Sequence, residues 1–156
     1  MATTTRAQID AFLSLKRIAV VGVSRSPREF SRALFQEFRR RKYDAVPVNP
    51  AAAEVDDTRC YSSVVAISPK VDGAFLITPP ALTSLAVRDC DAAGIRNVWI
   101  WGGAGAGCAN QDALSFCQSC GISAISGHCP FMFFPGTQLV HRLHGFFKRL
   151  TGSYPR

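Results

Sequence analysis

The chain has 156 residues, of which 47% are hydrophobic, and it carries a formal net charge of +7. This length and composition suit one domain with a single substantial core. The N-terminus, MATTTRAQID, lacks the basic and apolar regions of a secretory signal, and no apolar run reaches the roughly 18 residues that a membrane span requires. We therefore expect a cytoplasmic protein without a membrane segment. Its six cysteines are expected to be reduced, because disulfide frameworks belong to small secreted chains that lack a core.

Strands and helices are predicted to alternate along the chain. The predicted strands are 18–23, 45–48, 73–77, 97–101 and 122–125, and the first of them is a β-branched run with no polar alternation. Apolar residues at helical spacing predict helices at 5–15, 27–42, 82–93, 113–120 and after 137. The segment 51–59 has no periodicity and is expected to form a loop. This order indicates an α/β fold, a Rossmann-like, doubly wound, mostly parallel sheet of about five strands with helices on both faces.

Capping boxes mark the starts of the first two helices. Thr5 and Gln8 have the required spacing, and so do Ser26 and Glu29, with Pro27 at the first helical position. The helix after the first strand is therefore expected to begin at Pro27.

This second helix is expected to bury an apolar face made of Phe30, Ala33, Leu34 and Phe38. The basic run at 39–42 closes its last turn, where cations suit the helix dipole. A surface that stacks nucleic-acid bases would need interleaved aromatic residues, which this run lacks. The placement of the positive charge therefore does not favour nucleic acid as a partner.

The turn after the first strand has the layout of a phosphate-binding βα unit. Gly22 permits a tight turn, and the backbone N–H groups of a helix start can face an anion. Arg25, Arg28 and Arg32 lie in this turn and in the first turns of the predicted helix, where positive side chains oppose the helix dipole unless an anion is near. The segment therefore predicts a phosphate ligand. The alternative is a solvated helix start in a basic domain.

The sequence lacks two common nucleotide-binding motifs, and this narrows the choice of phosphate ligand. A dinucleotide fingerprint reads G-x-G-x-x-G and is followed by an acidic residue at the end of the second strand. Here Ser24 and Pro27 occupy the second and third glycine positions, and the second strand ends in Asn49-Pro50. Ordinary NAD is thereby disfavoured, whereas NADP stays open because its additional phosphate suits arginine. The Walker pattern G-x-x-x-x-G-K does not occur.

Six short motifs carry a resemblance to a known family through their order and spacing. They are GVSRSP at 22–27, VPVNP at 46–50, VDG at 71–73, TPP at 78–80, AGI at 93–95 and CPFM at 129–132. The chain resembles the stand-alone CoA-binding-domain proteins of bacteria, which are similar to the CoA-binding domain of succinyl-CoA synthetase and of the NDP-forming acyl-CoA synthetases. The resemblance spans nearly the whole chain and implies a single CoA-binding, Rossmann-like domain over residues 1–156.

The resemblance also implies a ligand and a site. It implies that coenzyme A or an acyl-CoA binds with its phosphates in the loop after the first strand, its adenosine part beside Asn49-Pro50 and its pantetheine arm along 77–79. The residues of this expected site are Gly22, Val23, Ser24, Arg25, Ser26, Arg28, Arg32, Asn49, Pro50, Ile77, Thr78 and Pro79. The chain departs from the family at Lys42, where such proteins often place a glycine before the second strand.

A glycine-rich run at 102–107 follows the fourth predicted strand and is able to approach a ligand closely. Trp101 is the side chain best placed there to stack on a ligand. A lid and a plain loop are the alternative interpretations of this run.

No catalytic residue and no metal site are predicted. The larger synthetases carry a phosphorylated histidine in a separate domain that the resemblance does not reach, so His128 is not its counterpart. His128 and Cys129 are adjacent in an extended segment and should point apart, which favours a structural thiol over a nucleophile pair. Cys117 and Cys120 lie at a helix end, whereas redox pairs of this spacing begin a helix.

The leading hypothesis is a module that binds the small molecule CoA or an acyl-CoA and has no catalysis of its own. Two alternatives stay open, an NADP-dependent oxidoreductase and a CoA-dependent acyl transferase that uses Cys129 covalently. The acyl group, the pathway, an enzyme partner and a homo-oligomer are also left open by the sequence.

Overall fold

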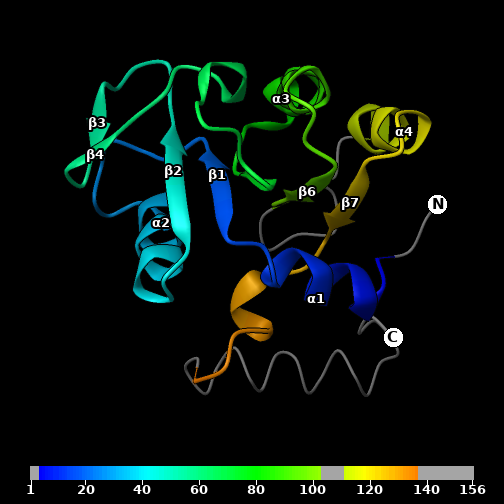
Figure 1. Cartoon of the computed structure of the whole chain (residues 1–156), viewed down its shortest axis with the longest axis horizontal. Helices are drawn as coiled ribbons and strands as arrows, with labels where there is room; N and C mark the ends of the chain where they lie inside the picture. Colours follow the sequence, from blue (N-terminus) through cyan, green and yellow to red (C-terminus); the bar gives the residue numbers. More distant parts are fainter. Residues whose placement is uncertain (1–3, 103–110, 137–156) are drawn as a thin grey trace.

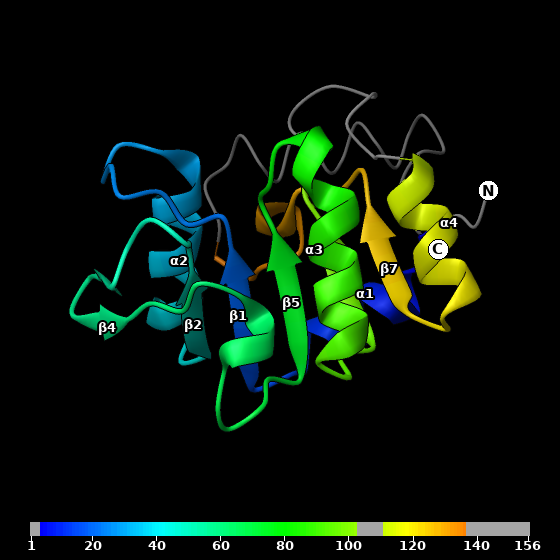
Figure 2. The ribbon, with the colours of Figure 1, turned by 90° about the horizontal axis from the view of Figure 1, so that it is seen from above.

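A parallel five-stranded sheet organises the computed structural model, which describes residues 4–102 and 111–136. The strands are β1 (Arg17–Val21), β2 (Asp44–Val48), β5 (Gly73–Leu76), β6 (Asn97–Ile100) and β7 (Ser123–Ser126). They lie in the order β2-β1-β5-β6-β7, and every neighbouring pair is parallel. The predicted α/β fold with a doubly wound sheet is therefore confirmed (Figures 1 and 2).

Helices cover both faces of the sheet. One face carries α1 (Arg6–Leu13) and α2 (Phe30–Arg40), and the other carries α3 (Pro80–Ala92), α4 (Gln111–Ser119) and the short helix η1 (Val64–Ala66). A second short helix, η2 (Pro130–Met132), follows β7. Figure 1 shows α3 and α4 on one side of the strands and α1 with η2 on the opposite side.

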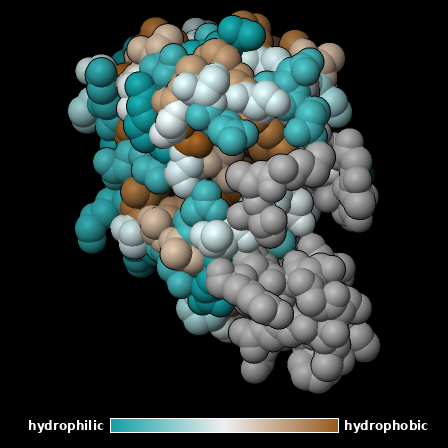
Figure 3. Space-filling model, turned by 90° about the vertical axis from the view of Figure 1, so that its right-hand side faces the viewer, coloured by the Kyte–Doolittle hydropathy of each residue, from teal (hydrophilic) through white to brown (hydrophobic). Residues whose placement is uncertain are grey.

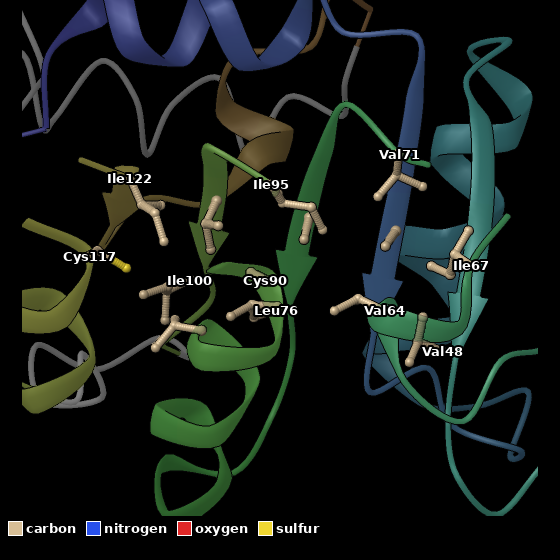
Figure 4. Close-up of a cluster of buried hydrophobic side chains, with 14 of the residues drawn as sticks. Val48, Val64, Ile67, Val71, Leu76, Cys90, Ile95, Ile100, Cys117 and Ile122 are labelled. Atoms are coloured by element: carbon tan, nitrogen blue, oxygen red, sulfur yellow. The ribbon is translucent and has the colours of Figure 1, made fainter. Parts of the chain in front are cut away.

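The cores on the two faces differ in chemistry. Aliphatic side chains and buried thiols fill the space beneath α3, α4 and η1, as Figure 4 shows for Leu76, Ile100 and Cys90. The face beneath α1 and α2 is aromatic, with Phe75 stacked on Trp99 at a centroid distance of 5.5 Å. Because each strand contributes side chains to both cores, the middles of the strands are apolar on both faces rather than alternating.

The first predicted capping box is confirmed and the second is wrong. Thr5 and Gln8 cap α1 reciprocally. The second helix begins at Phe30 instead of Pro27, and its N-cap residue makes no side-chain capping bond. The hydroxyl of Ser24 accepts a hydrogen bond from the N–H of Ser26 at 3.0 Å, and this local bond holds the segment in a turn that competes with the helix.

The late start of α2 also changes its buried face. Leu34 and Phe38 are buried as predicted, together with Ser31 and Phe35. Phe30 and Ala33 are exposed, so their predicted place on the buried face is wrong. Phe30 is the first residue of the helix, and its ring instead contacts aromatic rings from other elements.

The segment 51–59 is not a plain loop, because it contains a small hairpin of β3 (Glu54–Val55) and β4 (Thr58–Arg59). Asp56 and Asp57 connect the strands with φ angles of +48° and +57°. Positive φ at both central residues is the geometry of a type I′ hairpin turn, in which aspartate is tolerated. Strands of two residues are too short to produce a periodic sequence pattern.

Three helices end in the same way. In each, the residue after the C-cap has a positive φ, and the two N–H groups beyond the helix bond back to its last turn, as in a Schellman motif. Gly94 and Gly121 occupy this position after α3 and α4. Lys42 occupies it after α2 with a φ of +69°.

The described surface is mixed in polarity. Figure 3 shows the side of the molecule that carries α4, where hydrophobic and hydrophilic residues are interspersed. Within residues 4–102 and 111–136, no helix is long and apolar enough to cross a membrane. The helix predicted after 137 and the glycine-rich run from 103 onward lie outside the described residues.

Candidate ligand-binding site

The candidate site lies where the chain changes direction across the sheet. After β1 the chain moves outward to β2, and it returns on the other side of β1 as β5. In open α/β sheets, ligands bind outside the carboxyl ends of the strands at such a switch point. Gly22, Asn49 and Ile77 directly follow these three strands, so the fold brings the predicted site segments together. Figure 2 shows the arrowheads of β1, β5 and β7 pointing to the same edge.

Gly22 fixes the loop after β1 against β5. Its φ is +92°, and a Cβ atom at this position would lie 2.3 Å from the carbonyl oxygen of Ile77. Its N–H donates to the carbonyl of Val48 at 2.9 Å. Only glycine permits both this φ and this close approach, so the loop leaves the sheet along one defined path.

Asn49 ties the end of β2 to the same loop. Its side-chain amide donates to the carbonyl of Val23 at 2.8 Å, and its side-chain oxygen accepts from the N–H of Ala51 at 2.8 Å. Its backbone N–H donates to the carbonyl of Tyr61 at 2.9 Å. Asn49 therefore positions the loop, a role that the sequence alone did not indicate.

The loop itself presents two exposed cations. Ser24 donates its N–H to the hydroxyl of Ser31 at 2.9 Å, so the loop is held to the first turn of α2. Arg25, Ser26 and Arg28 are exposed. Within the described part of the chain, neither Arg25 nor Arg28 forms an ion pair. Their positive charge is available to an anion beside the loop.

Arg32 has a different environment from the other two predicted arginines. Its side chain is only 11% exposed and forms an ion pair with Asp56 in the β3–β4 hairpin. It also donates to the carbonyl oxygens of Ser24 and Arg25, at 3.2 and 3.1 Å. Arg32 thus holds the loop in place through its bonds to two loop carbonyls, and its charge is already matched by the carboxylate of Asp56.

The ion pair with Arg32 contributes to a lowered pKa of Asp56. Burial by itself raises the pKa, but hydrogen bonds from Arg32 and Gln36 and the charges of Arg32 and Arg39 outweigh burial and hold it below its ordinary value. Asp56 is therefore a charged partner of the arginines at neutral pH. This contact could not be predicted from the sequence, because the hairpin that carries Asp56 was not predicted.

The third segment of the candidate site, which follows β5, is held by hydrogen bonds of threonine hydroxyl groups. The hydroxyls of Thr78 and Thr83 are 2.9 Å apart, and that of Thr83 also lies 3.2 Å from the carbonyl of Pro79. These bonds, together with Pro80 at the first position of α3, set the direction in which the chain leaves β5. The side chain of Ile77 packs against the aromatic core.

The basic run at the end of α2 serves internal contacts. Arg40 and Arg41 pair with Glu37, and Arg39 donates to the carbonyl of Asp56 at 2.9 Å. The guanidinium of Arg41 also lies 4.3 Å from the ring centroid of Phe134. Arg39 and Arg41 thereby fasten α2 to neighbouring segments, whereas Arg40 pairs within the helix.

Within the described part of the chain, Cys60, Cys90, Cys117 and Cys120 are free thiols. Burial raises the pKa of Cys90 to about 12 and that of Cys117 to about 11. Among the residues that the structure describes, no group of three or more potential metal ligands occurs. The carbonyl of His128 accepts a hydrogen bond from the indole of Trp99 at 3.0 Å, and Cys129 directly precedes η2.

Comparison with known proteins agrees with this geometry. A family model described as a CoA binding domain matches residues 16–135, which include all three site segments. The chain belongs to this CoA-binding-domain family. Among curated proteins, the chain is 29% identical over 93 residues to the ADP-forming acetate–CoA ligase II subunit alpha of Pyrococcus furiosus. The match covers 59% of this chain but only 20% of that relative.

Solved structures share the fold of this CoA-binding-domain protein. A hypothetical protein from Pyrococcus horikoshii is 26% identical, with a TM-score of 0.73, and the match covers 83% of this chain and 93% of that one. The apo form of a dinucleotide-forming acetyl-coenzyme A synthetase from Ca. Korarchaeum cryptofilum is 23% identical, with a TM-score of 0.61, and the match covers 73% and 26% of the two chains. The second likeness concerns the fold alone.

Proposed function

We propose that this protein binds coenzyme A or an acyl-CoA at the carboxyl ends of β1, β2 and β5. The observation that carries the proposal is the pair of exposed, unpaired cations, Arg25 and Arg28, on a loop that Gly22 and Asn49 hold at the switch point of the sheet. Membership of the CoA-binding-domain family supports the same ligand. The proposed binding residues are Gly22, Val23, Ser24, Arg25, Ser26, Arg28, Arg32, Asn49, Pro50, Ile77, Thr78 and Pro79.

The ligand is expected to be recognised first by its phosphates. A hydrogen bond to a charged group contributes about 1.5–3 kcal/mol, so each arginine that contacts phosphate should change affinity about tenfold or more. Arg25 and Arg28 are exposed, so replacing them should leave the fold intact. Arg32 has a bracing role in addition, and its replacement would disturb the loop itself.

Calorimetric titration with CoA, dephospho-CoA, NAD and NADP tests the proposal. We expect CoA to bind most tightly and dephospho-CoA more weakly, because it lacks the ribose phosphate. Arg25→Ala and Arg28→Ala should each weaken CoA binding about tenfold or more. Equal and negligible binding of all four compounds would refute the proposal, and the tightest binding by NADP would favour an oxidoreductase instead.

Lys16→Ala is the matched control for these arginine variants. Lys16 is exposed and directly precedes β1, at the opposite edge of the sheet from the candidate site. Its removal changes the net charge by the same amount as each arginine substitution. If Lys16→Ala weakened binding as much as Arg28→Ala, general attraction by a basic protein would explain the effect, and the loop would lose its assigned role.

We assign no catalytic residue to this chain. The chain spans a fifth of the length of the acetate–CoA ligase subunit that it matches, so the ligase activity of that relative is not transferred to it. We further infer that residues 1–156 form one domain, because the described helices all pack on one sheet. The free thiols of Cys60, Cys90, Cys117 and Cys120 support a location in the cytoplasm, where thiols remain reduced.

A further inference from the structure

Three aromatic rings converge at the edge of the candidate site. Phe30 stacks on Trp101 with ring centroids 4.9 Å apart and an interplanar angle of 23°. Phe131 lies against Phe30 at 6.0 Å. These rings come from the start of α2, the end of β6 and the short helix η2. We call Phe30, Trp101 and Phe131 the aromatic shelf.

The aromatic shelf lies beside the proposed binding loop. The backbone N–H of Trp101 donates to the carbonyl of Leu76 at 2.9 Å, which places Trp101 at the carboxyl end of β5 as well as of β6. Phe30 directly follows the loop that begins at Gly22. Ile77, Trp101 and Phe131 rest on the aromatic core, so the shelf has a firm base.

The exposure of Phe30 is unusual for its helix. Phe30 is 37% exposed, although α2 buries Leu34, Phe35 and Phe38 on its inner face. A single exposed apolar side chain needs no explanation. Here, however, the exposed ring extends a stack of aromatic residues from three elements, and such surfaces bordering a polar site are typical of ligand contacts.

The surfaces on the two sides of the loop after β1 differ in polarity. Toward β2 the loop borders Asn49 and the pair of Arg32 with Asp56, which are polar and charged. Toward β6 it borders the aromatic shelf. With neighbouring strands about 4.8 Å apart, the end of β6 lies about 10 Å from the end of β1. A long ligand anchored by phosphate at β1 therefore meets a polar surface in one direction and an aromatic surface in the other.

We propose that the aromatic shelf receives the acyl group of an acyl-CoA, and that the protein prefers thioesters with an apolar aromatic acyl group over free CoA. This inference rests on the proposed function. The phosphorylated nucleotide end of the ligand suits the polar side toward β2, and the acyl end is the apolar part that an aromatic surface attracts. An aromatic acyl group that stacks on Phe30 or Trp101 should increase affinity about tenfold relative to free CoA.

Titration of the full chain with CoA, acetyl-CoA and phenylacetyl-CoA tests this inference. We expect phenylacetyl-CoA to bind about tenfold more tightly than CoA, with acetyl-CoA between them. In Phe30→Ala and Trp101→Phe, the dissociation constant of CoA divided by that of phenylacetyl-CoA should fall toward one. The tryptophan fluorescence change on binding of phenylacetyl-CoA should also shrink in Trp101→Phe, because Trp99 is fully buried.

Leu85→Ala is the matched control, because Leu85 is 59% exposed on α3 and lies outside the shelf. It should leave the ratio unchanged. Equal affinities for CoA and phenylacetyl-CoA in the wild-type protein would overturn the inference while leaving CoA binding in place. A Phe30→Ala variant that weakened both ligands by the same factor would also overturn it, because the shelf would then contact the shared nucleotide part. Failure of every CoA compound to bind would overturn the proposed function itself.

Discussion

The side-chain amide of Asn49 donates a hydrogen bond to the carbonyl of Val23 at 2.8 Å and so joins the end of β2 to the loop after β1. The other end of the same side chain accepts from the N–H of Ala51. One residue thereby controls the position of two loops at the switch point. The backbone pairing of β1 and β2 extends to the bond from Gly22 to Val48, and the Asn49 side chain carries the connection one residue further, to Val23.

Replacing Asn49 should destabilise the protein and disorder the loop. Asn49→Ala removes both side-chain bonds and should lower the free energy of unfolding by about 1–2 kcal/mol. Asn49→Asp keeps the acceptor for Ala51 but loses the donor to Val23, and it sets a carboxylate beside the proposed phosphates. Urea unfolding and CoA titration of both variants provide the measurement. Stability and affinity unchanged in Asn49→Ala would contradict the positioning role.

Gly22→Ala should be far more damaging than the same change at another glycine with positive φ. A Cβ at position 22 would meet the carbonyl oxygen of Ile77 at 2.3 Å, whereas a Cβ at Gly121 would meet nothing within 4 Å. Gly121→Ala should cost about 1 kcal/mol from backbone strain alone. Gly22→Ala adds displacement of β5 from the loop and should cost several times as much in urea unfolding. Similar costs for the two variants would show that the close approach is unimportant.

The sequence predicted the parts of the fold that local patterns control. Mostly apolar segments became the five strands, and the capping box at Thr5 starts α1 as expected. The box at Ser26 failed because Ser24 and Ser31 offer hydroxyl partners that hold the loop in a turn. That competition depends on residues several positions apart, which a capping pattern does not include.

The positions of the three candidate-site segments at adjacent strand ends were predicted from the sequence, but their internal bonds were not. Strand ends could be located from apolar runs, and parallel strands place their carboxyl ends together, so the three segments were found. Arg32 was counted with the phosphate-binding arginines, yet it pairs with Asp56, 24 residues away on an unpredicted hairpin. Long-range ion pairs of this kind follow from tertiary folding and leave no local pattern in a single sequence.

Lys42→Gly should stabilise the protein. Lys42 has a φ of +69°, and the N–H groups of Lys42 and Tyr43 bond back to the end of α2 in a Schellman motif. A residue with a side chain costs about 1 kcal/mol or more in this conformation, which glycine adopts without strain. We therefore expect the free energy of unfolding to rise by about 1 kcal/mol.

Lys42→Ala separates the backbone effect from the loss of the lysine side chain. It retains the strained φ and removes the charge, so it should change stability little. Thermal and urea unfolding of both variants provide the comparison. A gain in Lys42→Ala equal to that in Lys42→Gly would assign the effect to charge rather than to backbone conformation.

The pair of Arg32 and Asp56 should make stability depend on acidic pH. The pKa of Asp56 lies below its unfolded value of 3.8, so the folded state favours the charged carboxylate. The resulting stabilisation is fully present above the unfolded pKa and is lost as the pH falls through the lower, folded pKa. Asp56→Asn removes this contribution at every pH.

Urea unfolding of wild type and Asp56→Asn at a series of pH values checks this dependence. The difference in unfolding free energy should be largest near neutral pH and should shrink below the unfolded pKa. Asp10→Asn removes the same charge from an exposed pair with Arg6 on α1 and should have little effect at any pH. A wild-type advantage over Asp56→Asn that grew on acidification would contradict the assigned sign.

The buried thiols should resist alkylation in the native protein. Burial raises the pKa of Cys90 to about 12 and that of Cys117 to about 11. At pH 8 the reactive thiolate is then about one part in ten thousand for Cys90 and about one in a thousand for Cys117, and neither sulfur is accessible. Cys120, which follows α4 and is partly exposed, should react before Cys90 and Cys117.

Treatment with iodoacetamide at pH 8 followed by peptide mass mapping measures the order of reaction. Cys120→Ser should remove the adduct at this position and leave Cys117 unmodified, because burial contributes most to the raised pKa of Cys117. In urea every cysteine should react, which shows that the folded core and not the local sequence provides the protection. Rapid modification of Cys90 under native conditions would mean that α3 separates from the sheet, because its thiol lies in the core between them.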